Sequence, residues 1–236
     1  CGDIMKKVFN IEFIKHDELL SLVNGYLFMN AYNSFYEAEE IDSITRIPPE
    51  DFSFPHICVN IGSGVSILKV KSPTEFERVG GTLMGGGTLI GLSKLIMGID
   101  SYNEILELAG KGNYKNVDLT VKDIYRDEEE KYRSNNLPEN TVASSFGKIH
   151  EFIQSGQREK IKNEDIALSL LTMICFHITQ YAVIYAKENN IDKIYYFGNF
   201  TRRNSRATFA LAKATKYWNK NCKVRFNYYD GYLGAI

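Results

Sequence analysis

Cysteine is scarce in this 236-residue chain, and its few cysteines form none of the usual sequence motifs. The four cysteines, Cys1, Cys58, Cys175 and Cys222, include no C-x-x-C pair, and no Cys/His cluster has the spacing of a zinc site. We therefore expect neither a disulfide framework nor a bound metal. A reduced, cytoplasmic protein fits this cysteine usage best.

An excess of charge of one sign is also missing. The chain carries 28 Lys and Arg residues against 29 Asp and Glu residues, which gives a formal net charge of -1. Proteins that bind nucleic acid or anionic membranes usually show a basic excess, so we expect no nucleic acid and no membrane as partner. The longest apolar stretch, residues 166–186, is interrupted by Ser169, Thr172, His177 and Gln180, which favours a buried helix over a membrane span.

The chain does contain enough apolar residues, 44%, for one large or two small domains. Their pattern predicts a meander of strands followed by alternating helices and strands, hence a three-layer α/β fold with ligands at the strand ends. The expected strands are residues 7–14, 56–61, 65–70, 75–79, 191–197 and 224–229. The expected helices begin after Asp17 and cover residues 89–98, 101–110, 116–125, 163–188 and 203–218, whereas residues 37–55 and 126–140 are expected to be surface connections.

Glycines are concentrated in residues 59–88, where a Gly62-Ser63-Gly64 turn joins two expected strands and Gly85-Gly86-Gly87 precedes a helix. Glycine lets the backbone approach a ligand closely. A glycine-rich loop before a helix also presents unpaired backbone N–H groups, which suit an anion or a polar ligand. The dinucleotide fingerprint does not fit, because the first glycine pair leads into a strand, and no P-loop motif occurs.

Several polar residues allow two interpretations. Glu18 is expected in the first turn of a helix, where the helix dipole favours a carboxylate whether or not it is catalytic. Ser63 and Ser66 can be ordinary turn and strand residues, and Arg78 can be an ordinary surface charge. The same side chains can bind a ligand, because a guanidinium pairs with a carboxylate and hydroxyls hydrogen-bond amides and alcohols.

Eight short motifs share their order and spacing with one known family. They are Asn60-Ile61-Gly62-Ser63-Gly64-Val65-Ser66-Ile67-Leu68, Arg78-Val79 with Gly81-Thr82, Gly85-Gly86-Gly87-Thr88, Gly110-Lys111-Gly112, Val121-Lys122-Asp123-Ile124-Tyr125, Val142-Ala143-Ser144-Ser145-Phe146-Gly147, Phe197-Gly198-Asn199-Phe200 and Asp230-Gly231-Tyr232. From about Asp17 onward the chain resembles the type II, eukaryotic-type, pantothenate kinases of the acetate-kinase, sugar-kinase and actin-like ATPase superfamily. Each motif alone is weak, but eight in register make an accidental match improbable.

The resemblance implies an actin-like ATPase (ribonuclease H-like) lobe, a mixed sheet flanked by helices. It implies an ATP-dependent kinase that converts pantothenate to 4'-phosphopantothenate in coenzyme A biosynthesis, with ATP and Mg²⁺ as co-substrates and no tightly bound cofactor. Family members are dimers inhibited by acyl-CoA, so we expect a homodimer or a dimer with a paralogue. The family's Asp-x-Gly-Gly-Thr ATP-phosphate loop is not found here. Residues 1–236 are therefore expected to be the second, substrate-binding and dimerising lobe, nearly inert without the first.

The resemblance also assigns residues to roles. Glu18, in Asp17-Glu18-Leu19, would be the base that acts on the pantothenate hydroxyl. The substrate-binding residues would be Ser63, Ser66, Arg78, Gly81, Thr82, Gly85 and Gly86, with Gly80 to Thr88 making room for a slender pantetheine-like chain. Acyl-CoA or dimer contacts would be Ile124, Tyr125, Val142, Ala143, Arg202 and Trp218, and nucleotide contacts would be Gly62, Gly64, Gly198 and Asn199.

Two other functions stay open. One is a non-catalytic, regulatory relative that binds acyl-CoA or a partner kinase subunit, and it is suggested by the missing phosphate loop. The other is a sugar or acyl kinase of the same superfamily. Leu83 and Thr201 depart from the residues usual in the family, which puts the selectivity for the acyl group in doubt.

Overall fold

The computed structural model describes residues 2–9, 16–32, 34–41, 43–125, 138–202 and 204–228. A seven-stranded sheet lies at its centre, in the order β2-β1-β9-β8-β3-β4-β5. Neighbouring β3, β8 and β9 are parallel, and the other pairs are antiparallel. The strands are β1 Phe35–Glu40, β2 Ser43–Arg46, β3 His56–Ile61, β4 Val65–Val70, β5 Phe76–Thr82, β8 Lys193–Phe197 and β9 Lys223–Asn227.

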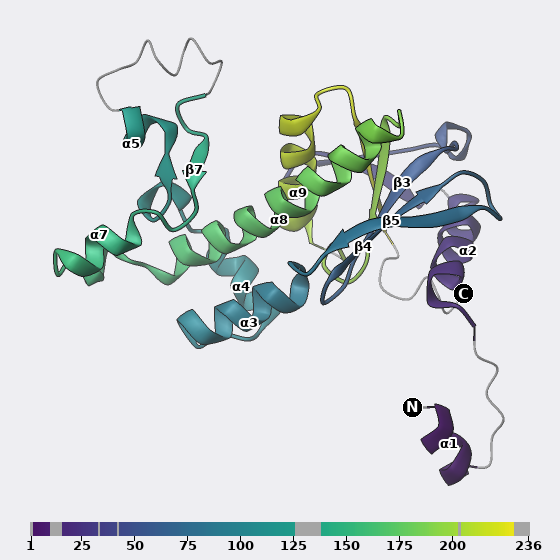
Figure 1. Cartoon of the computed structure of the whole chain (residues 1–236), viewed down its shortest axis with the longest axis horizontal. Coiled ribbons are helices and arrows are strands. Elements are labelled where there is room, and N and C mark those ends of the chain that lie inside the picture. Colours follow the sequence, from purple (N-terminus) through teal and green to yellow (C-terminus); the bar gives the residue numbers. More distant parts are fainter. Residues whose placement is uncertain are drawn as a thin grey trace.

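Helices cover both faces of the sheet, because its central strands are apolar on both sides. In β3, Ile57 and Val59 pack with α8 in one apolar cluster, whereas Cys58 packs with α2 in another. The predicted mixed sheet flanked by helices is therefore confirmed (Figure 1). The helices are α2 Glu18–Asn30 on one face, and α3 Gly86–Met97, α4 Tyr102–Ala109, α8 Asn163–Glu188 and α9 Ser205–Trp218 on the other.

The 26-residue helix α8 is long and apolar enough to cross a membrane, judged by length and composition alone. In this protein it is a core helix, since 61% of its most apolar window is buried inside the molecule. It packs against α9, α4 and α3, and Leu170, Ile174 and Ile178 belong to the larger apolar cluster. This agrees with the buried helix predicted from the interrupted apolar run.

Beyond the sheet, the first turns of α8 carry a small unit that we call the distal unit (Figure 1). It consists of η2 Tyr114–Asn116, β6 Leu119–Thr120, α5 Val121–Tyr125, β7 Val142–Ser144, α7 Ile149–Gln154 and η3 Arg158–Lys160. The prediction of one helix over residues 116–125 is wrong for residues 116–120. Asp118 is fully buried there and accepts hydrogen bonds from the Phe146 N–H and the Ser169 hydroxyl, so this segment turns inward before α5 begins.

Two expectations about the N-terminal part are wrong. Residues 7–9 belong to α1 Gly2–Phe9 and not to a strand, and the rest of residues 7–14 lies outside the described ranges. Residues 37–55 are not a plain surface connection, because they contain most of the β1–β2 hairpin and η1 Pro49–Asp51. Buried Tyr36 and Ala38 anchor β1, while exposed acids at its end hide the alternation. The motif at residues 230–232, residue 229 and most of residues 126–140 lie outside the described part of the chain.

Candidate active site

An open cleft of about 450 Å³ lies where the start of α2 meets the β3–β4 turn and the end of β5. It brings together six of the residues that the sequence predicted for substrate binding or catalysis. The cleft is lined by Glu18, Asn60, Gly62, Ser63, Gly64, Val65, Ser66, Arg78, Gly81, Thr82 and Leu83. Residues from three separate segments of the sequence therefore converge on one cleft.

The strand register explains this convergence. Asn60 pairs with Ser66 across β3 and β4, and Ser66 pairs with Gly81 across β4 and β5. Side chains two residues apart share a face of a sheet, so Asn60 lies on the same face as Cys58, which α2 covers. The part of this face that α2 covers is apolar, and the part beyond α2 is polar. The cleft lies at the boundary between these two parts.

Glu18 is the first residue of α2, and it is not the residue that caps the helix. Asp17 does this, because its Oδ1 accepts a hydrogen bond of 2.7 Å from the Leu20 N–H. Glu18 is exposed and makes no hydrogen bond or ion pair with any described residue. Its carboxylate lines the cleft and is free to act on a ligand.

A buried pair holds α2, and with it Glu18, against the sheet. The Tyr26 hydroxyl lies 2.9 Å from Nε2 of His56, and Nδ1 of His56 lies 3.1 Å from the Ser53 carbonyl oxygen. A carbonyl can only accept, so Nδ1 carries the proton and Nε2 accepts from Tyr26. Burial, together with the charges of Lys193 and Arg225, lowers the pKa of His56 to about 4, so the ring is neutral at pH 7.

Four other polar side chains of the cleft also lack partners within the described part of the chain, whereas the Thr82 hydroxyl accepts a hydrogen bond from the Met84 N–H. Arg78 forms no ion pair, and the side chains of Ser63, Ser66 and Asn60 make no hydrogen bond. Sequence reasoning missed Asn60 as a site residue. The available signal was a carboxamide inside an otherwise apolar strand, HICVNI. A group of unpaired donors and acceptors in one cleft is what a polar ligand requires.

The Gly85-Gly86-Gly87 cluster differs from the prediction of free N–H groups. The Gly86 N–H donates to the Gly62 carbonyl at 2.9 Å, and the Gly87 N–H donates to the Ser63 carbonyl at 3.0 Å. A Cβ on Gly85 would lie 2.7 Å from the Ser63 carbonyl oxygen. These glycines therefore let the start of α3 dock on the β3–β4 turn, and Gly85 and Gly86 lie outside the cleft lining.

Glycines on β5 have a similar explanation. A Cβ on Gly81 would clash with the Val65 carbonyl oxygen, and a Cβ on Gly80 would clash with the ring of Tyr185. The strand also runs on to Thr82, three residues past the predicted end at residue 79. The atoms that these Cβ positions would meet belong to the protein itself, so close packing accounts for both glycines, while Gly81 also lines the cleft.

Comparison with known proteins identifies the family. The model described as Fumble matches residues 1–236. The chain belongs to the Fumble family. It is 38% identical over 242 residues to "Pantothenate kinase" of Schizosaccharomyces pombe, covering 99% of this chain and 59% of that protein. It is 36% identical over 240 residues to "Pantothenate kinase 1" of Arabidopsis thaliana, covering 100% of this chain and 61% of that protein.

The Fumble-family chain thus spans less than two thirds of the length of these curated relatives. Among solved structures it is similar to glucokinase from Balamuthia mandrillaris in complex with glucose, with a TM-score of 0.42 and 11% identity. That match covers 92% of this chain and 62% of the glucokinase chain. A likeness this weak carries no conclusion about fold or function.

The predicted nucleotide residues of this Fumble-family chain lie at one edge of the sheet. Parallel strands β3 and β8 pair Asn60 with Phe197, so Gly62 and Gly198 follow at neighbouring strand ends. Gly198 has φ +105, and a Cβ there would clash with the Ile61 backbone, so glycine is needed. Asn199 is exposed beside it. Ligands of α/β sheets commonly bind at this carboxyl edge.

The remaining predicted residues do not reach the cleft within one chain. Ile124, Tyr125, Val142 and Ala143 lie in α5 and β7 of the distal unit (Figure 1), and none of them lines the cleft. Arg202 lies in the exposed turn after β8. Trp218 ends α9 and packs against Phe176 and Tyr217. Its Nε1 is buried and has no hydrogen-bond partner in the part of the chain that the structure describes.

Proposed function

We propose that the full-length protein containing this chain is a pantothenate kinase, which transfers the γ-phosphoryl group of ATP to pantothenate. One observation supports this most directly: a carboxylate, Glu18, and a guanidinium, Arg78, share one cleft without neutralising each other or any described neighbour. Pantothenate carries a carboxylate at one end and a primary hydroxyl at the other, which is the complementary arrangement. The names of the curated relatives support the same substrate.

In this proposal Arg78 binds the carboxylate of pantothenate, and Ser63 and Ser66 hydrogen-bond its polar middle. Glu18 accepts the proton of the primary hydroxyl while the hydroxyl oxygen attacks the γ-phosphorus of ATP. The new O–P bond forms as the bond between the γ-phosphorus and the bridging oxygen breaks, and ADP leaves with that oxygen. Phosphoryl transfer depends mostly on positioning and charge stabilisation, so the cleft has to hold the acceptor in line.

ATP would approach at the edge formed by Gly62, Gly64, Gly198 and Asn199, next to the acceptor hydroxyl. Among the described residues no group of three or more His, Cys, Asp or Glu side chains could hold a metal ion. Mg²⁺ in kinases is usually held by the substrate phosphates and one or two carboxylates, so the ion would arrive with ATP. We infer that the main grip on the ATP phosphates lies in a first lobe outside residues 1–236.

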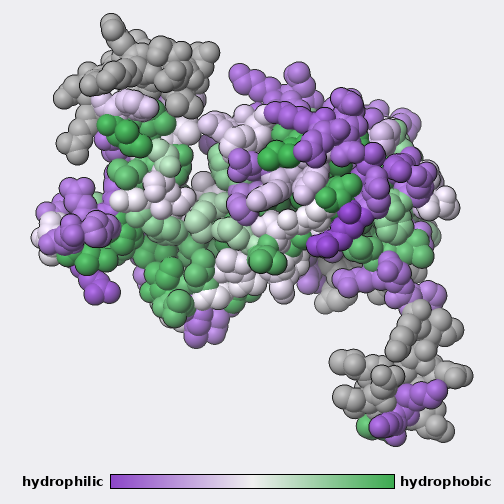
Figure 2. All heavy atoms as spheres, viewed as in Figure 1, coloured by the Kyte–Doolittle hydropathy of each residue, from purple (hydrophilic) through white to green (hydrophobic). Residues whose placement is uncertain are grey.

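A dimer, with itself or a paralogue, and inhibition by acyl-CoA belong to the same proposal. Val142 and Ala143 do not line the cleft of their own chain, so in this proposal they serve the neighbouring one. Exposed apolar side chains on α3 fit a covered surface, since Leu95 is 81% and Ile96 is 50% exposed. Figure 2 shows hydrophobic surface over this helix.

A cytoplasmic location completes the proposal. The three described cysteines, Cys58, Cys175 and Cys222, are all buried free thiols. Burial raises the pKa of the Cys175 and Cys222 thiols, so neither is a reactive thiolate. Free buried thiols are usual in reducing compartments.

Substitution of the proposed base tests the function directly. In the full-length protein, Glu18→Gln should lower kcat by roughly 10²- to 10⁴-fold, because the amide cannot accept the proton. Binding of pantothenate, measured by isothermal titration calorimetry, should persist. Glu104→Gln is a matched control, because Glu104 also lies in a first helical turn behind a separate N-cap residue, Ser101. Full turnover by Glu18→Gln would remove Glu18 from this role.

The two rival functions give different outcomes in the same assay. A sugar kinase would phosphorylate N-acetylglucosamine in place of pantothenate. A non-catalytic relative would bind acyl-CoA but show no ATP turnover with either acceptor. Pantothenate-dependent release of ADP by the wild-type protein is the result that we expect.

A further inference from the structure

Asn60 is a polar residue of the cleft lining that has no role in the predicted site or in the proposed mechanism. It lies on β3, in a strand whose other residues, from His56 to Ile61, are buried. Its own side chain is partly exposed and lines the cleft. No described residue donates to its carbonyl oxygen or accepts from its amide nitrogen. An amide left without partners in a half-buried place costs free energy unless a ligand or water satisfies it.

The position of Asn60 relative to the other groups follows from the sheet. Asn60 on β3 is directly opposite Ser66 on β4, and Arg78 lies on the next strand, β5. Neighbouring strands are about 4.8 Å apart, so the backbones that carry Asn60 and Arg78 are about two spacings apart, roughly 10 Å. A ligand whose carboxylate is held by Arg78 therefore passes Ser66 and Asn60 as it extends across the strands.

The chemistry of a carboxamide narrows what Asn60 can recognise. Its oxygen accepts a hydrogen bond and its nitrogen donates, so its best match is a ligand group that also does both. A secondary amide has one N–H donor and one C=O acceptor, and pantothenate has such an amide between its carboxylate and its hydroxyls. A hexose without an acetamido group, such as glucose, offers only hydroxyls there, which serine side chains alone can satisfy.

We propose that Asn60 is a specificity-determining residue that pairs with the secondary amide of the substrate. This rests on the proposed pantothenate kinase function and adds the group that distinguishes an amide-containing acid from other acceptors. The Asn60 Oδ1 accepts from the substrate N–H, and the Asn60 Nδ2 donates to the substrate carbonyl oxygen.

An ester analogue of pantothenate, in which oxygen replaces the amide N–H, tests the contact at a single atom. The full-length wild-type protein should show a kcat/KM for the ester roughly three- to tenfold lower than for pantothenate, the range of one net hydrogen bond. Asn60→Leu has nearly the same shape but cannot accept that hydrogen bond. Its kcat/KM for pantothenate should fall, and the extra penalty for the ester should disappear.

A second variant separates recognition from folding. Asn60→Asp keeps the shape but replaces the donor with an acceptor and adds a negative charge near the bound carboxylate, so KM for pantothenate should rise at least about tenfold. Asn24→Asp, on the exposed side of α2, is the charge-matched control and should leave KM unchanged. Thermal unfolding of each variant shows whether the fold is retained.

Three outcomes would overturn the proposal while leaving the kinase function intact. The ester penalty could be equal in wild type and Asn60→Leu, or Asn60→Asp could keep the wild-type KM. The third outcome concerns an analogue of pantothenate that lacks the secondary hydroxyl. If the penalty for this analogue, and not the penalty for the ester, disappeared in Asn60→Leu, Asn60 would be assigned to that hydroxyl. Failure of the function itself looks different, because wild type would then not turn over pantothenate at all.

Discussion

Arg78 contributes a positive charge to the lining of the cleft. Its guanidinium folds back over β5, with one terminal nitrogen 3.1 Å from the place where a Cβ on Gly81 would stand. Glycine at position 81 thus gives the guanidinium room to turn toward the cleft. No described carboxylate pairs with it, so its strongest available partner is a ligand anion.

Loss of this cation should weaken substrate binding more than catalysis. Hydrogen bonds to charged groups are worth about 1.5–3 kcal/mol, so Arg78→Gln should raise KM for pantothenate by roughly 10- to 150-fold with a smaller change in kcat. Arg78→Lys should recover part of the loss because it keeps the charge without the fork geometry. Arg158→Gln, in the distal unit, is the control. Unchanged KM in Arg78→Gln would show that the substrate carboxylate binds elsewhere.

At the scale of elements, glycine at the start of α3 lets this helix pack directly on the backbone of the β3–β4 hairpin. A side chain at Gly85 would meet the Ser63 backbone, whereas Gly91 in the same helix has nothing within 4 Å of an added Cβ. Gly85→Ala should therefore lower the free energy of unfolding by at least about 1 kcal/mol. Gly91→Ala should raise it by up to about 1 kcal/mol, since alanine favours helix. Urea unfolding measures both, and equal effects would contradict the docking role.

The contact between α2 and β3 gives stability a dependence on pH. The pKa of His56 is about 4 in the folded protein and about 6.5 in the unfolded chain, so between these values only the unfolded chain is protonated. Stability from this residue is complete above pH 6.5 and is lost as the pH falls toward 4, by up to about 1.4 kcal/mol per pH unit. Urea unfolding at pH 7 and pH 5 should show this loss in wild type.

His56→Gln is the comparison for that experiment. It cannot titrate, so its stability should fall less between pH 7 and pH 5 than that of wild type, even though it starts lower. Tyr26→Phe removes the hydroxyl that donates to Nε2 but keeps the titrating ring, and should retain most of the pH dependence. An identical pH dependence in wild type and His56→Gln would show that His56 is not the group responsible.

Sequence patterns predicted elements well where local signals and burial agree. The Asp17 cap, the turn at Gly62 to Gly64 and the long helix α8 are examples. The patterns failed at residues 116–120. There the Asp118 carboxylate accepts hydrogen bonds from Phe146 and Ser169, both distant in sequence, and the backbone is not helical at Asp118. No local pattern contains such a tertiary partner.

The site divides in the same way. Motif resemblance named Glu18, Ser66 and Arg78 as site residues, and the fold brings all three to one cleft. The resemblance could not show that the N–H groups of Gly86 and Gly87 already donate to the hairpin, or that Asn60 has no partner among the described residues. Both facts depend on strand register and on helix docking, which the order of residues does not specify.

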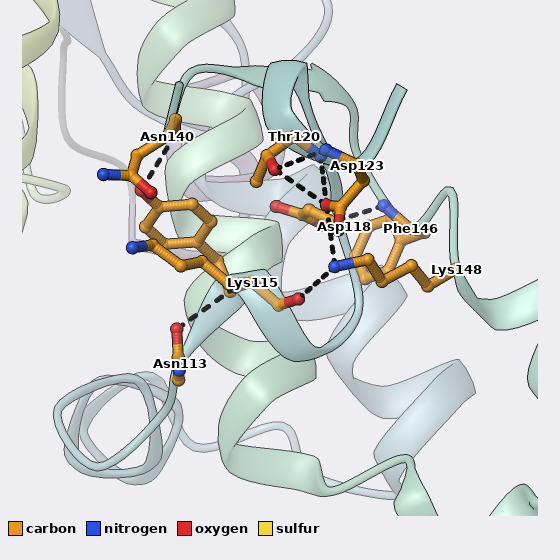
Figure 3. Close-up of polar contacts among 9 residues, drawn as sticks. Asn113, Lys115, Asp118, Thr120, Asp123, Asn140, Phe146 and Lys148 are labelled. Atoms are coloured by element: carbon orange, nitrogen blue, oxygen red, sulfur yellow. Dashed lines mark hydrogen bonds and ion pairs between the residues drawn. The ribbon is translucent and has the colours of Figure 1, made fainter. Parts of the chain in front are cut away.

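At the scale of the whole molecule, α8 joins two parts with different internal supports. The sheet end is held by two apolar clusters, whereas the distal unit combines a few buried apolar residues, such as Val117 and Val121, with a network of polar contacts. Figure 3 shows this network: Lys148 donates to the Lys115 carbonyl oxygen at 2.7 Å and pairs with Asp123 at 2.8 Å, while Asp118 accepts from the Phe146 N–H at 2.8 Å. Burial raises the pKa of Asp118, and its second oxygen has no hydrogen-bond partner among the described residues.

A polar attachment of this kind should open separately from the sheet. Asp118→Ala leaves the Phe146 N–H and the Ser169 hydroxyl without their acceptor, a cost of about 1–3 kcal/mol for buried groups. Amide hydrogen exchange should therefore speed up by about 5- to 150-fold in residues 114–125 and 142–154, with little change in β3 and β8. Asp100→Ala, which removes only an exposed ion pair with Lys94, is the control.

The same variant connects this attachment to the proposed function. If Val142 and Ala143 serve the neighbouring chain, a loosened distal unit should weaken the dimer and reduce sensitivity to acyl-CoA. The turnover number of the cleft should stay nearly the same, because Glu18 and Arg78 are held by α2 and β5. Analytical ultracentrifugation and an inhibition curve on the full-length Asp118→Ala protein measure the first two effects. Faster exchange across β3 and β8 as well would instead make Asp118 a support of the whole fold, and a loss of turnover would then follow from unfolding.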